Sequence, residues 1–246
     1  MKITKQTEEL ERGLVFELRR QLGDNYLGLL CCGSRAYGDD LEDSDYDGYC
    51  YVKDAKKAEK IFDAAPLEKE YPGVRIGICF YDDSFVRMVK DNYADDQRRF
   101  YWASLLGPRA RLVDGKDLRA GFPSAAKLRS GNWAAAFLHE YHIVLDPKHP
   151  ANVLKREPRR HVGYIIATCD QLLLALGVAA KSKRELPALM AKHHPKFKIV
   201  TLLRRALWRR ENWPRIEGDK RQVAAAKKDV KKFLLLLGRY VGAEKR

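Results

Sequence analysis

The sequence contains no long hydrophobic run and no apolar segment near its first residue. Its longest apolar runs, such as residues 172–180, are far shorter than the ~20 residues that a membrane-spanning helix needs. The first thirteen residues are polar from the start and lack the apolar region of a secretory signal peptide. We therefore expect a protein without a membrane anchor that works in the cytoplasm.

Cysteine is sparse and carries no metal-binding or disulfide spacing. The five cysteines include no Cys-x-x-Cys pair. Four of them lie in apolar, strand-like runs, and Cys169 lies in an expected helix. This distribution favours buried thiols in a reducing compartment over a disulfide framework or a zinc site.

Acidic residues are scarce in the second half of the chain. Residues 1–100 hold 16 Lys and Arg against 21 Asp and Glu, whereas residues 101–246 hold 31 against 12. The net charges are therefore −5 and +19. Solvated helix faces explain most basic runs, but this imbalance suggests RNA or another polyanion as a partner. Trp133, Trp208 and Trp213 could offer stacking surfaces, although tryptophans are more often part of a core.

The most informative stretch is residues 26–52. An apolar run over residues 26–32 predicts a strand, and Gly33-Ser34 then interrupts it. A short polar segment and an acidic loop lead to Asp45-Tyr46-Asp47 and a second apolar run over residues 48–52. We interpret this stretch as a strand, a tight turn, a short helix, a loop and a second strand.

Asp45 and Asp47 are candidate metal ligands. Side chains of a strand alternate between faces, so these two carboxylates are expected on one face, roughly 6–7 Å apart. A divalent cation would relieve their mutual repulsion, and Mg²⁺ prefers a few carboxylate oxygens together with substrate phosphates. The pair therefore predicts half of a metal–nucleotide site.

Gly33 and Ser34 supply the other half of that expected site. Glycine lets a phosphate approach the backbone closely. A serine at the start of a helix adds a hydroxyl donor beside the N–H groups of the first turn, which attract anions. The bland alternative is an acidic surface loop that follows a buried strand.

The spacing of these residues resembles the signature of the polymerase-β nucleotidyltransferase superfamily. The signature consists of Gly-Ser, nine residues and Ser-Asp-x-Asp, which here is Gly33-Ser34 followed by Ser44-Asp45-Tyr46-Asp47. The resemblance covers residues 25–115. It implies an NTP substrate and two Mg²⁺ ions held by Asp45 and Asp47. It also implies phosphate or nucleotide contacts from Gly33, Ser34, Arg35 and Ser44.

One element of the superfamily pattern is missing from this sequence. A third carboxylate usually comes from the next central strand, but the strand expected over residues 74–81 carries Arg75 and Gly77 at the relevant places. Three interpretations stay open. Asp82 serves as the third catalytic acid, or an acid from elsewhere such as Glu70 or Glu140 serves, or the site lacks a third acid and is weak or inactive.

The fold class expected is α+β, with a small mixed β-sheet and flanking helices followed by an all-α C-terminal domain. In the first half we expect helices over residues 4–22, 53–65, 83–89 and 95–106, and an edge strand at residues 111–113. Gly121-Phe122-Pro123 marks the expected boundary, which gives a catalytic domain over residues 1–121 and a basic helical domain over residues 122–246. Helical spacing in the second half predicts helices over residues 125–145, 161–176, 185–192, 197–210 and 222–240.

Some polar segments of the second half suggest a functional site but also fit a structural role. His139 and His142 lie at i, i+3 around Glu140, but the segment is not the HExxH pattern of zinc enzymes. The segment from Arg156 to His161 has the R-x4-H spacing of a class of helical ribonucleases, although Pro158 interrupts any helix there. Lys181 and Lys183, in a loop between helices, are candidate triphosphate contacts.

The function expected is Mg²⁺-dependent transfer of an NMP, in the first instance AMP, from an NTP to a hydroxyl acceptor. The acceptor is a small molecule, RNA or a protein, and the charge does not favour a polycationic antibiotic over these. The alternatives are a catalytically impaired nucleotide-binding or antitoxin-like protein, and a nucleic-acid-binding module that acts through the basic half. The oligomeric state stays open.

Overall fold

The computed structural model describes residues 3–40, 44–92, 102–103, 105–107, 109–124, 127, 148 and 157–243. The chain divides into two compact units. Unit 1 comprises Met1–Tyr93 with Tyr101–Ser124, and unit 2 comprises Ala94–Phe100 with Ala125–Arg246. The sequence predicted a catalytic domain over residues 1–121 and a helical domain over residues 122–246. This assignment of boundary and roles stays a prediction.

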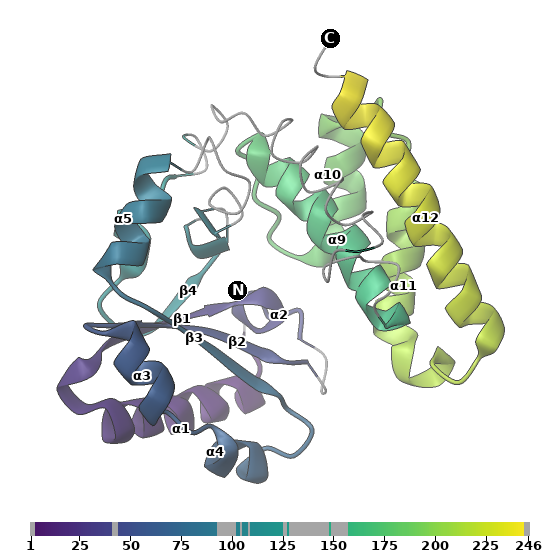
Figure 1. Cartoon of the computed structure of the whole chain (residues 1–246). Coiled ribbons are helices and arrows are strands. Elements are labelled where there is room, and N and C mark those ends of the chain that lie inside the picture. Colours follow the sequence, from purple (N-terminus) through teal and green to yellow (C-terminus); the bar gives the residue numbers. More distant parts are fainter. Residues whose placement is uncertain are drawn as a thin grey trace. The chain divides into compact units, whose positions relative to one another are not determined.

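Unit 1 is built on a four-stranded mixed sheet with the order β3-β2-β1-β4. Its strands are β1 (Tyr26–Cys32), β2 (Tyr46–Val52), β3 (Ile76–Tyr81) and β4 (Arg111–Gly115). β1 pairs antiparallel with both β2 and β4, whereas β2 pairs parallel with β3. β4 lies at an edge of the sheet, as the sequence predicted (Figure 1).

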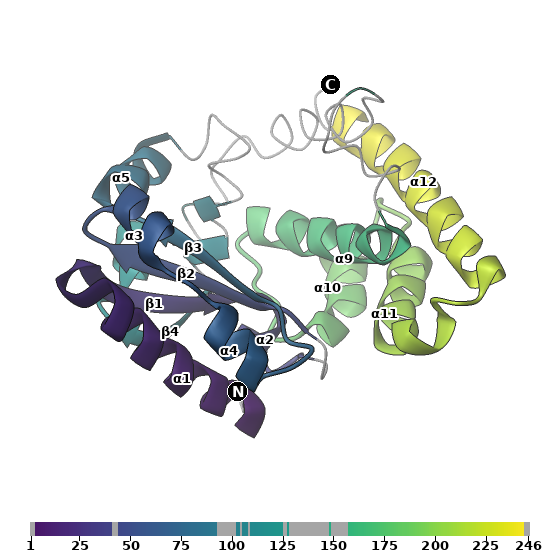
Figure 2. The same cartoon turned by 60° about the horizontal axis from the view of Figure 1, so that its bottom comes forward.

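One face of this sheet is covered by helices. α1 (Lys5–Leu22) directs Leu10, Leu14 and Leu18 into a core that also contains Leu29 of β1 and Cys50 of β2. α3 (Ala55–Ile61) and α4 (Ala65–Glu70) contribute to the same core. Figures 1 and 2 show α1 and α4 together on that side of the sheet. The residues that alternate with the core residues along β1, β2 and β3 therefore point to the opposite face.

The single helix expected over residues 53–65 is wrong, because the structure has two short helices in this region. α3 ends at Ile61, and a separate helix, α4, begins at Ala65 with Pro66 in its first turn. Proline lacks an N–H group, and the first turn of a helix needs no such donor. Pro66 therefore starts the second helix and does not stop the first.

The cysteines are all free thiols. Cys31, Cys32, Cys50 and Cys169 are buried, as the sequence predicted, but Cys79 of β3 is exposed. Cys79 alternates with the core residues Ile78 and Phe80, so its side chain points to the face opposite α1.

The described residues of unit 2 form helices joined by turns and loops, with no strand among them. Its main helices are α9 (Pro158–Ala175), α10 (Leu186–His193), α11 (Val200–Ile216) and α12 (Lys220–Ala243). α9 packs against each of the other three helices. α11 runs through Pro214 to Ile216, so the break expected from residue 213 begins about one turn later. Among the helices described, none combines the length and apolarity needed to span a membrane.

These two units confirm the predicted α+β fold class. Several expectations lie outside the described residues: the helix over residues 125–145, most of the helix over residues 95–106, and Trp133, His139, Glu140, His142 and Arg156. The helix α5 (Asp83–Asn92) is longer than the predicted 83–89. α9, which contains His161, begins at Pro158.

A buried ion cluster joins α11 to α12. Arg205 donates to Asp229 through Nε at 2.9 Å and through Nη2 at 2.7 Å, and Arg209 donates through Nη1 at 2.5 Å. Burial alone would raise the pKa of Asp229, but the hydrogen bonds from Arg205 and Arg209 outweigh it and lower the pKa. The carboxylate therefore stabilises the folded state wherever it is ionised.

The substitution Asp229→Asn should lower the free energy of unfolding by about 3 kcal/mol near neutral pH, because it leaves the buried guanidinium of Arg209 without its counter-charge. A group whose folded-state pKa is lowered stabilises above its unfolded pKa and loses that effect as pH falls. The difference between the two proteins in urea unfolding should therefore shrink as the pH falls through the lowered pKa of Asp229. Glu217→Gln, at an exposed position of the same unit, should change stability by less than about 0.5 kcal/mol.

Candidate functional site

The Gly-Ser segment and the aspartate pair meet at one end of β1 and β2. α2 (Gly33–Tyr37) follows β1 directly, and β2 begins at Tyr46. Asp45 and Asp47 are both exposed, whereas Tyr46 between them is buried against the α1 side. Because strand side chains alternate, the two carboxylates stand on the sheet face opposite α1.

Gly33 lies directly against the carboxylate of Asp47. A Cβ atom built at Gly33 would stand 2.5 Å from Asp47 Oδ2, and Gly33 has a φ of 70°. Both the left-handed backbone conformation and the close approach require glycine. The tight turn predicted at Gly33-Ser34 is therefore packed onto the aspartate that follows it by fourteen residues.

The strand register sets the neighbours of Asp47. Cys32 of β1 is paired with Asp47 on one side, and Gly77 of β3 is paired with it on the other. Burial, followed by the neighbouring Cys31 and Asp47, raises the pKa of the Cys32 thiol well above its usual value. Cys32 thus forms a neutral wall of the site next to the carboxylate.

Position 77 shows why the third carboxylate is missing. The residue of β3 beside Asp47 is a glycine, and Arg75 precedes it by two positions on the same face. The backbone N–H of Tyr46 donates to the carbonyl of Arg75 at 2.8 Å, which places exposed Arg75 beside Asp45. The parallel pairing of β2 and β3 brings the guanidinium of Arg75 to the site. The periodicity of the sequence did not predict this position.

Asp82 does not join the aspartate pair, which corrects one catalytic assignment. It lies five residues after Gly77, beyond the opposite end of β3, roughly 17 Å along the strand direction. Its Oδ1 accepts from the N–H of Ser84 at 3.0 Å and from the N–H of Phe85 at 3.3 Å. The hydrogen bond from the Ser84 hydroxyl lowers its pKa, and the carboxylate caps the start of α5. Glu70 interacts with Tyr71, which packs on the α1 side of the sheet.

Arg35 is a structural residue, which corrects its assignment as a phosphate contact. Its side chain is 0% exposed. The guanidinium donates twice to the backbone carbonyl of Ser44, at 3.1 and 2.8 Å, and once to the hydroxyl of Thr7 at 2.9 Å. Asp40 Oδ2 lies 3.5 Å from Arg35 Nη1. Arg35 therefore fixes the residue that directly precedes Asp45 and leaves no donor for a ligand at the surface.

The remaining predicted contacts have different positions. Ser34 is half-buried in α2, and Ser44 is buried. Lys181 is exposed and Lys183 is half-buried, and both belong to unit 2. Their predicted roles as nucleotide contacts stay predictions. Among the residues described, no three His, Cys, Asp or Glu side chains gather as a metal-binding group.

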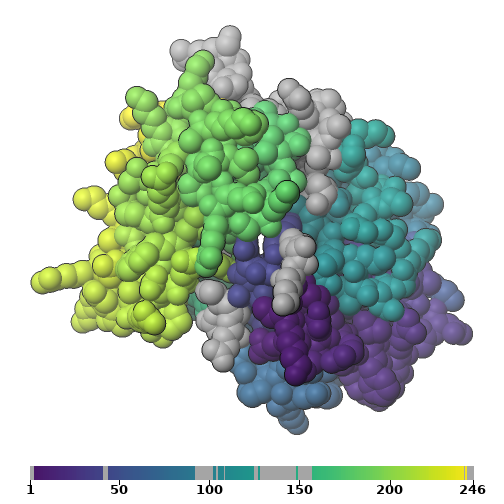
Figure 3. Space-filling view, turned by 180° about the vertical axis from the view of Figure 1, so that it is seen from behind, coloured from purple at the N-terminus to yellow at the C-terminus, as the bar shows by residue number. Residues whose placement is uncertain are grey.

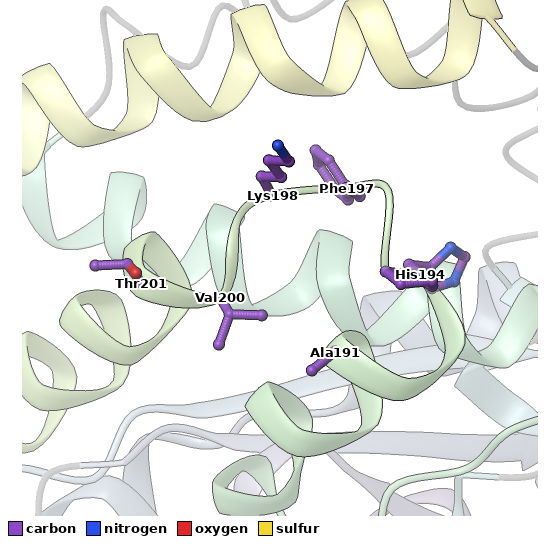
Figure 4. Close-up of a pocket in the computed structure, with 7 residues that line it drawn as sticks. Ala191, His194, Phe197, Lys198, Val200 and Thr201 are labelled. Atoms are coloured by element: carbon purple, nitrogen blue, oxygen red, sulfur yellow. The ribbon is translucent and has the colours of Figure 1, made fainter.

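A separate pocket of about 330 Å³ lies in unit 2, at the turn between α10 and α11. Figure 4 shows His194, Phe197 and Lys198 around this turn. His194 Nδ1 lies 2.7 Å from the hydroxyl of Tyr240, and Nε2 lies 3.2 Å from the carbonyl of Leu172. Both ring nitrogens therefore hold the helices together, and none of the predicted site residues lines this pocket.

Comparison with known proteins gives a likeness in fold. No protein-family model matches the chain, and no curated protein matches its sequence. Among solved structures, the chain is similar to the spectinomycin adenyltransferase AAD(9) from Enterococcus faecialis, which was crystallised with ATP and spectinomycin. The TM-score is 0.55 at 12% sequence identity, over 95% of this chain and 98% of that chain. The two chains therefore share a fold along nearly their full length.

The substitution Arg35→Met should destabilise unit 1 by about 3 kcal/mol, since Asp40 is then buried without its cation and the Ser44 carbonyl loses two donors. The measurement is urea unfolding followed by circular dichroism. Arg12→Met provides a matched control, because Arg12 is exposed on α1 and should tolerate the change within about 0.5 kcal/mol. Equal stability of both variants would contradict the structural role of Arg35.

Proposed function

We propose that this chain is a nucleotidyltransferase that moves an NMP, in the first instance AMP, from an NTP to a hydroxyl acceptor. The observation that carries the proposal is the contact between Gly33 and the exposed carboxylate of Asp47, on the sheet face that also holds the exposed Asp45. An acidic surface loop does not require a glycine in the left-handed conformation packed against its carboxylate. A phosphate site does, because the glycine leaves the backbone accessible beside the charge. The shared fold with an adenyltransferase supports the same proposal.

The donor set fits magnesium. Asp45 and Asp47 offer hard carboxylate oxygens on one face, and the absence of a Cβ at Gly33 lets the carboxylate of Asp47 lie against the backbone of the turn. These two aspartates would hold Mg²⁺, and we expect two ions at the site. When bound, magnesium supplies charge neutralisation at the phosphates and a lower pKa for the acceptor hydroxyl.

The protein residues would position the reactants. Ser34 provides a hydroxyl donor at the start of α2, next to the glycine against which the phosphates would lie. Arg75 provides a cation beside Asp45, suited to the negative charge that develops on the phosphoryl oxygens. Arg35 acts indirectly, through the carbonyl of Ser44, by fixing where β2 begins. Lys181 and Lys183 are proposed as further triphosphate contacts from unit 2.

The double substitution Asp45→Asn and Asp47→Asn should abolish nucleotide transfer while leaving the fold intact, because both carboxylates are exposed. Removal of charge stabilisation of this kind costs at least about 10²-fold in rate. The measurement is release of pyrophosphate from ATP with Mg²⁺, over a panel of small-molecule, RNA and protein acceptors. Asp24→Asn with Asp91→Asn removes two exposed carboxylates of the same unit and should keep full activity. Undiminished transfer by the Asp45 and Asp47 variant would refute the assignment.

A second candidate function is nucleotide binding with little or no transfer. It is favoured by Gly77, which stands beside Asp47 where a third carboxylate is expected, and by the position of Asp82 at the other end of β3. Such a protein would act as a catalytically impaired, antitoxin-like nucleotide binder. It keeps the glycine, serine and aspartate pair but lacks a third acid to assist the acceptor hydroxyl.

Calorimetry separates the two candidates when it is combined with the transfer assay. ATP, CTP, GTP and UTP are titrated into the protein with and without Mg²⁺. The transferase predicts Mg²⁺-dependent binding together with pyrophosphate release, and the impaired binder predicts the same binding without release. Binding that is equally strong in excess chelator would count against the aspartate pair as a metal site in either case.

A further inference from the structure

The outer face of α12 is basic, apart from the exposed Leu235. The helix contains seven Lys and Arg residues, and all of them are exposed. Four form two adjacent pairs at its centre, Lys227-Lys228 and Lys231-Lys232. Lys220 and Arg221 precede these pairs, and Arg239 follows them.

These charges share one side of the helix. At ~100° per residue, the seven positions fall within an arc of roughly 140° and extend over about 28 Å of helix length. The buried residues of α12, among them Val230, Phe233 and Leu237, lie on the opposite side. α12 packs through that side against α9 and α11, and Figures 1 and 2 show it alongside α9.

The basic face contains no balancing acid. Asp229 is the single acidic residue of α12, and it is turned inward to Arg205 and Arg209 of α11. Lys227 with Lys231, and Lys228 with Lys232, are like-charged pairs at i, i+4, and each such pair destabilises a helix by a few tenths of a kcal/mol. A face that only keeps a helix solvated is normally interspersed with acids, so this one is suited to a polyanion.

An exposed tryptophan lies close to this face. Trp208 of α11 is 49% exposed. It lies about one turn from Arg205, which reaches Asp229 of α12, and Arg204 and Arg215 are exposed near it on the same side of α11. The space-filling view shows long side chains of the yellow-green segment projecting from the surface (Figure 3). An exposed indole among arginines gives a planar surface on which an unpaired base can stack.

We propose that the basic face of α12, together with Trp208, binds single-stranded nucleic acid through its phosphates and its bases. The charge alone would also suit an anionic membrane, but the apolar side of α12 is buried in unit 2 and cannot insert into lipid. A duplex would engage the lysines but not the indole, since its bases are already stacked. Because neither contact uses the 2′-hydroxyl, RNA and DNA strands of one sequence should bind alike.

The first test is the salt dependence of binding. A fluorescein-labelled 20-nucleotide RNA is titrated with the full chain by anisotropy between 50 and 200 mM salt. Seven phosphate contacts give a slope of log K against log[salt] of about −5, at ~0.7 per contact for single strands. Substitution of Lys227, Lys228, Lys231 and Lys232 by Gln should reduce the slope to about −2. Lys53, Lys56, Lys57 and Lys60, all exposed in unit 1, provide a matched fourfold Gln variant that should leave the slope unchanged.

The second test isolates base stacking. Trp208→Ala should weaken single-strand binding by about 5- to 150-fold, whereas Trp208→Phe should largely retain it. Duplex RNA binding should change little in either variant. Phe16→Ala, which removes an exposed aromatic residue of α1, is the matched control and should have no effect.

Several outcomes would overturn the proposal. They are an unchanged slope in the α12 variant, equal loss in the matched unit 1 variant, duplex binding as tight as single-strand binding, or tighter binding to phosphatidylserine vesicles than to RNA. Circular dichroism of the α12 variant, in which Asp229 and its partners are untouched, verifies that loss of binding is not loss of fold. The Asp45→Asn and Asp47→Asn protein should bind RNA normally, so failure here and failure of the transfer proposal are distinguishable.

Discussion

The buried guanidinium of Arg35 is the contact on which the candidate site depends. Two of its hydrogen bonds go to the carbonyl of Ser44, and a third goes to Thr7 near the start of α1. These bonds fix the loop end that leads into β2, and thereby the residue at which the strand begins. A shift of one residue would turn Asp45 and Asp47 toward the α1 core and Tyr46 outward. The exposure of Asp45 and Asp47 therefore depends on the hydrogen bonds that Arg35 makes to Ser44.

Much of unit 1 could be predicted because its sequence signals are local. The apolar run over residues 26–32, the Gly33-Ser34 interruption and the alternation around Tyr46 all appear in the structure as β1, α2 and β2. In unit 2, the 3.6-residue apolar spacing located α9, α10 and α12 to within three residues at each end, whereas α11 runs six residues beyond its predicted end. The predicted site residues Gly33 and Asp47 are in contact, although no spacing rule states that contact.

The predictions that were wrong depended on long-range contacts. Arg35 is indistinguishable in sequence from a surface arginine, and only its burial between Thr7, Asp40 and Ser44 shows its role. Asp82 follows the correct strand, but the parallel register of β2 and β3 puts its end of that strand far from the aspartate pair. The same register brings Arg75 next to Asp45, because pairing between strands cannot be read from either strand alone.

The exposure of Cys79 has a practical consequence. It is the single exposed thiol among the five cysteines, and it lies two residues along β3 from Gly77, on the face that holds Asp47. A maleimide fluorophore or a nitroxide would therefore attach at one place, roughly 6–7 Å along the strand from Asp47. The unmodified protein thus already carries a spectroscopic attachment point beside the proposed nucleotide site.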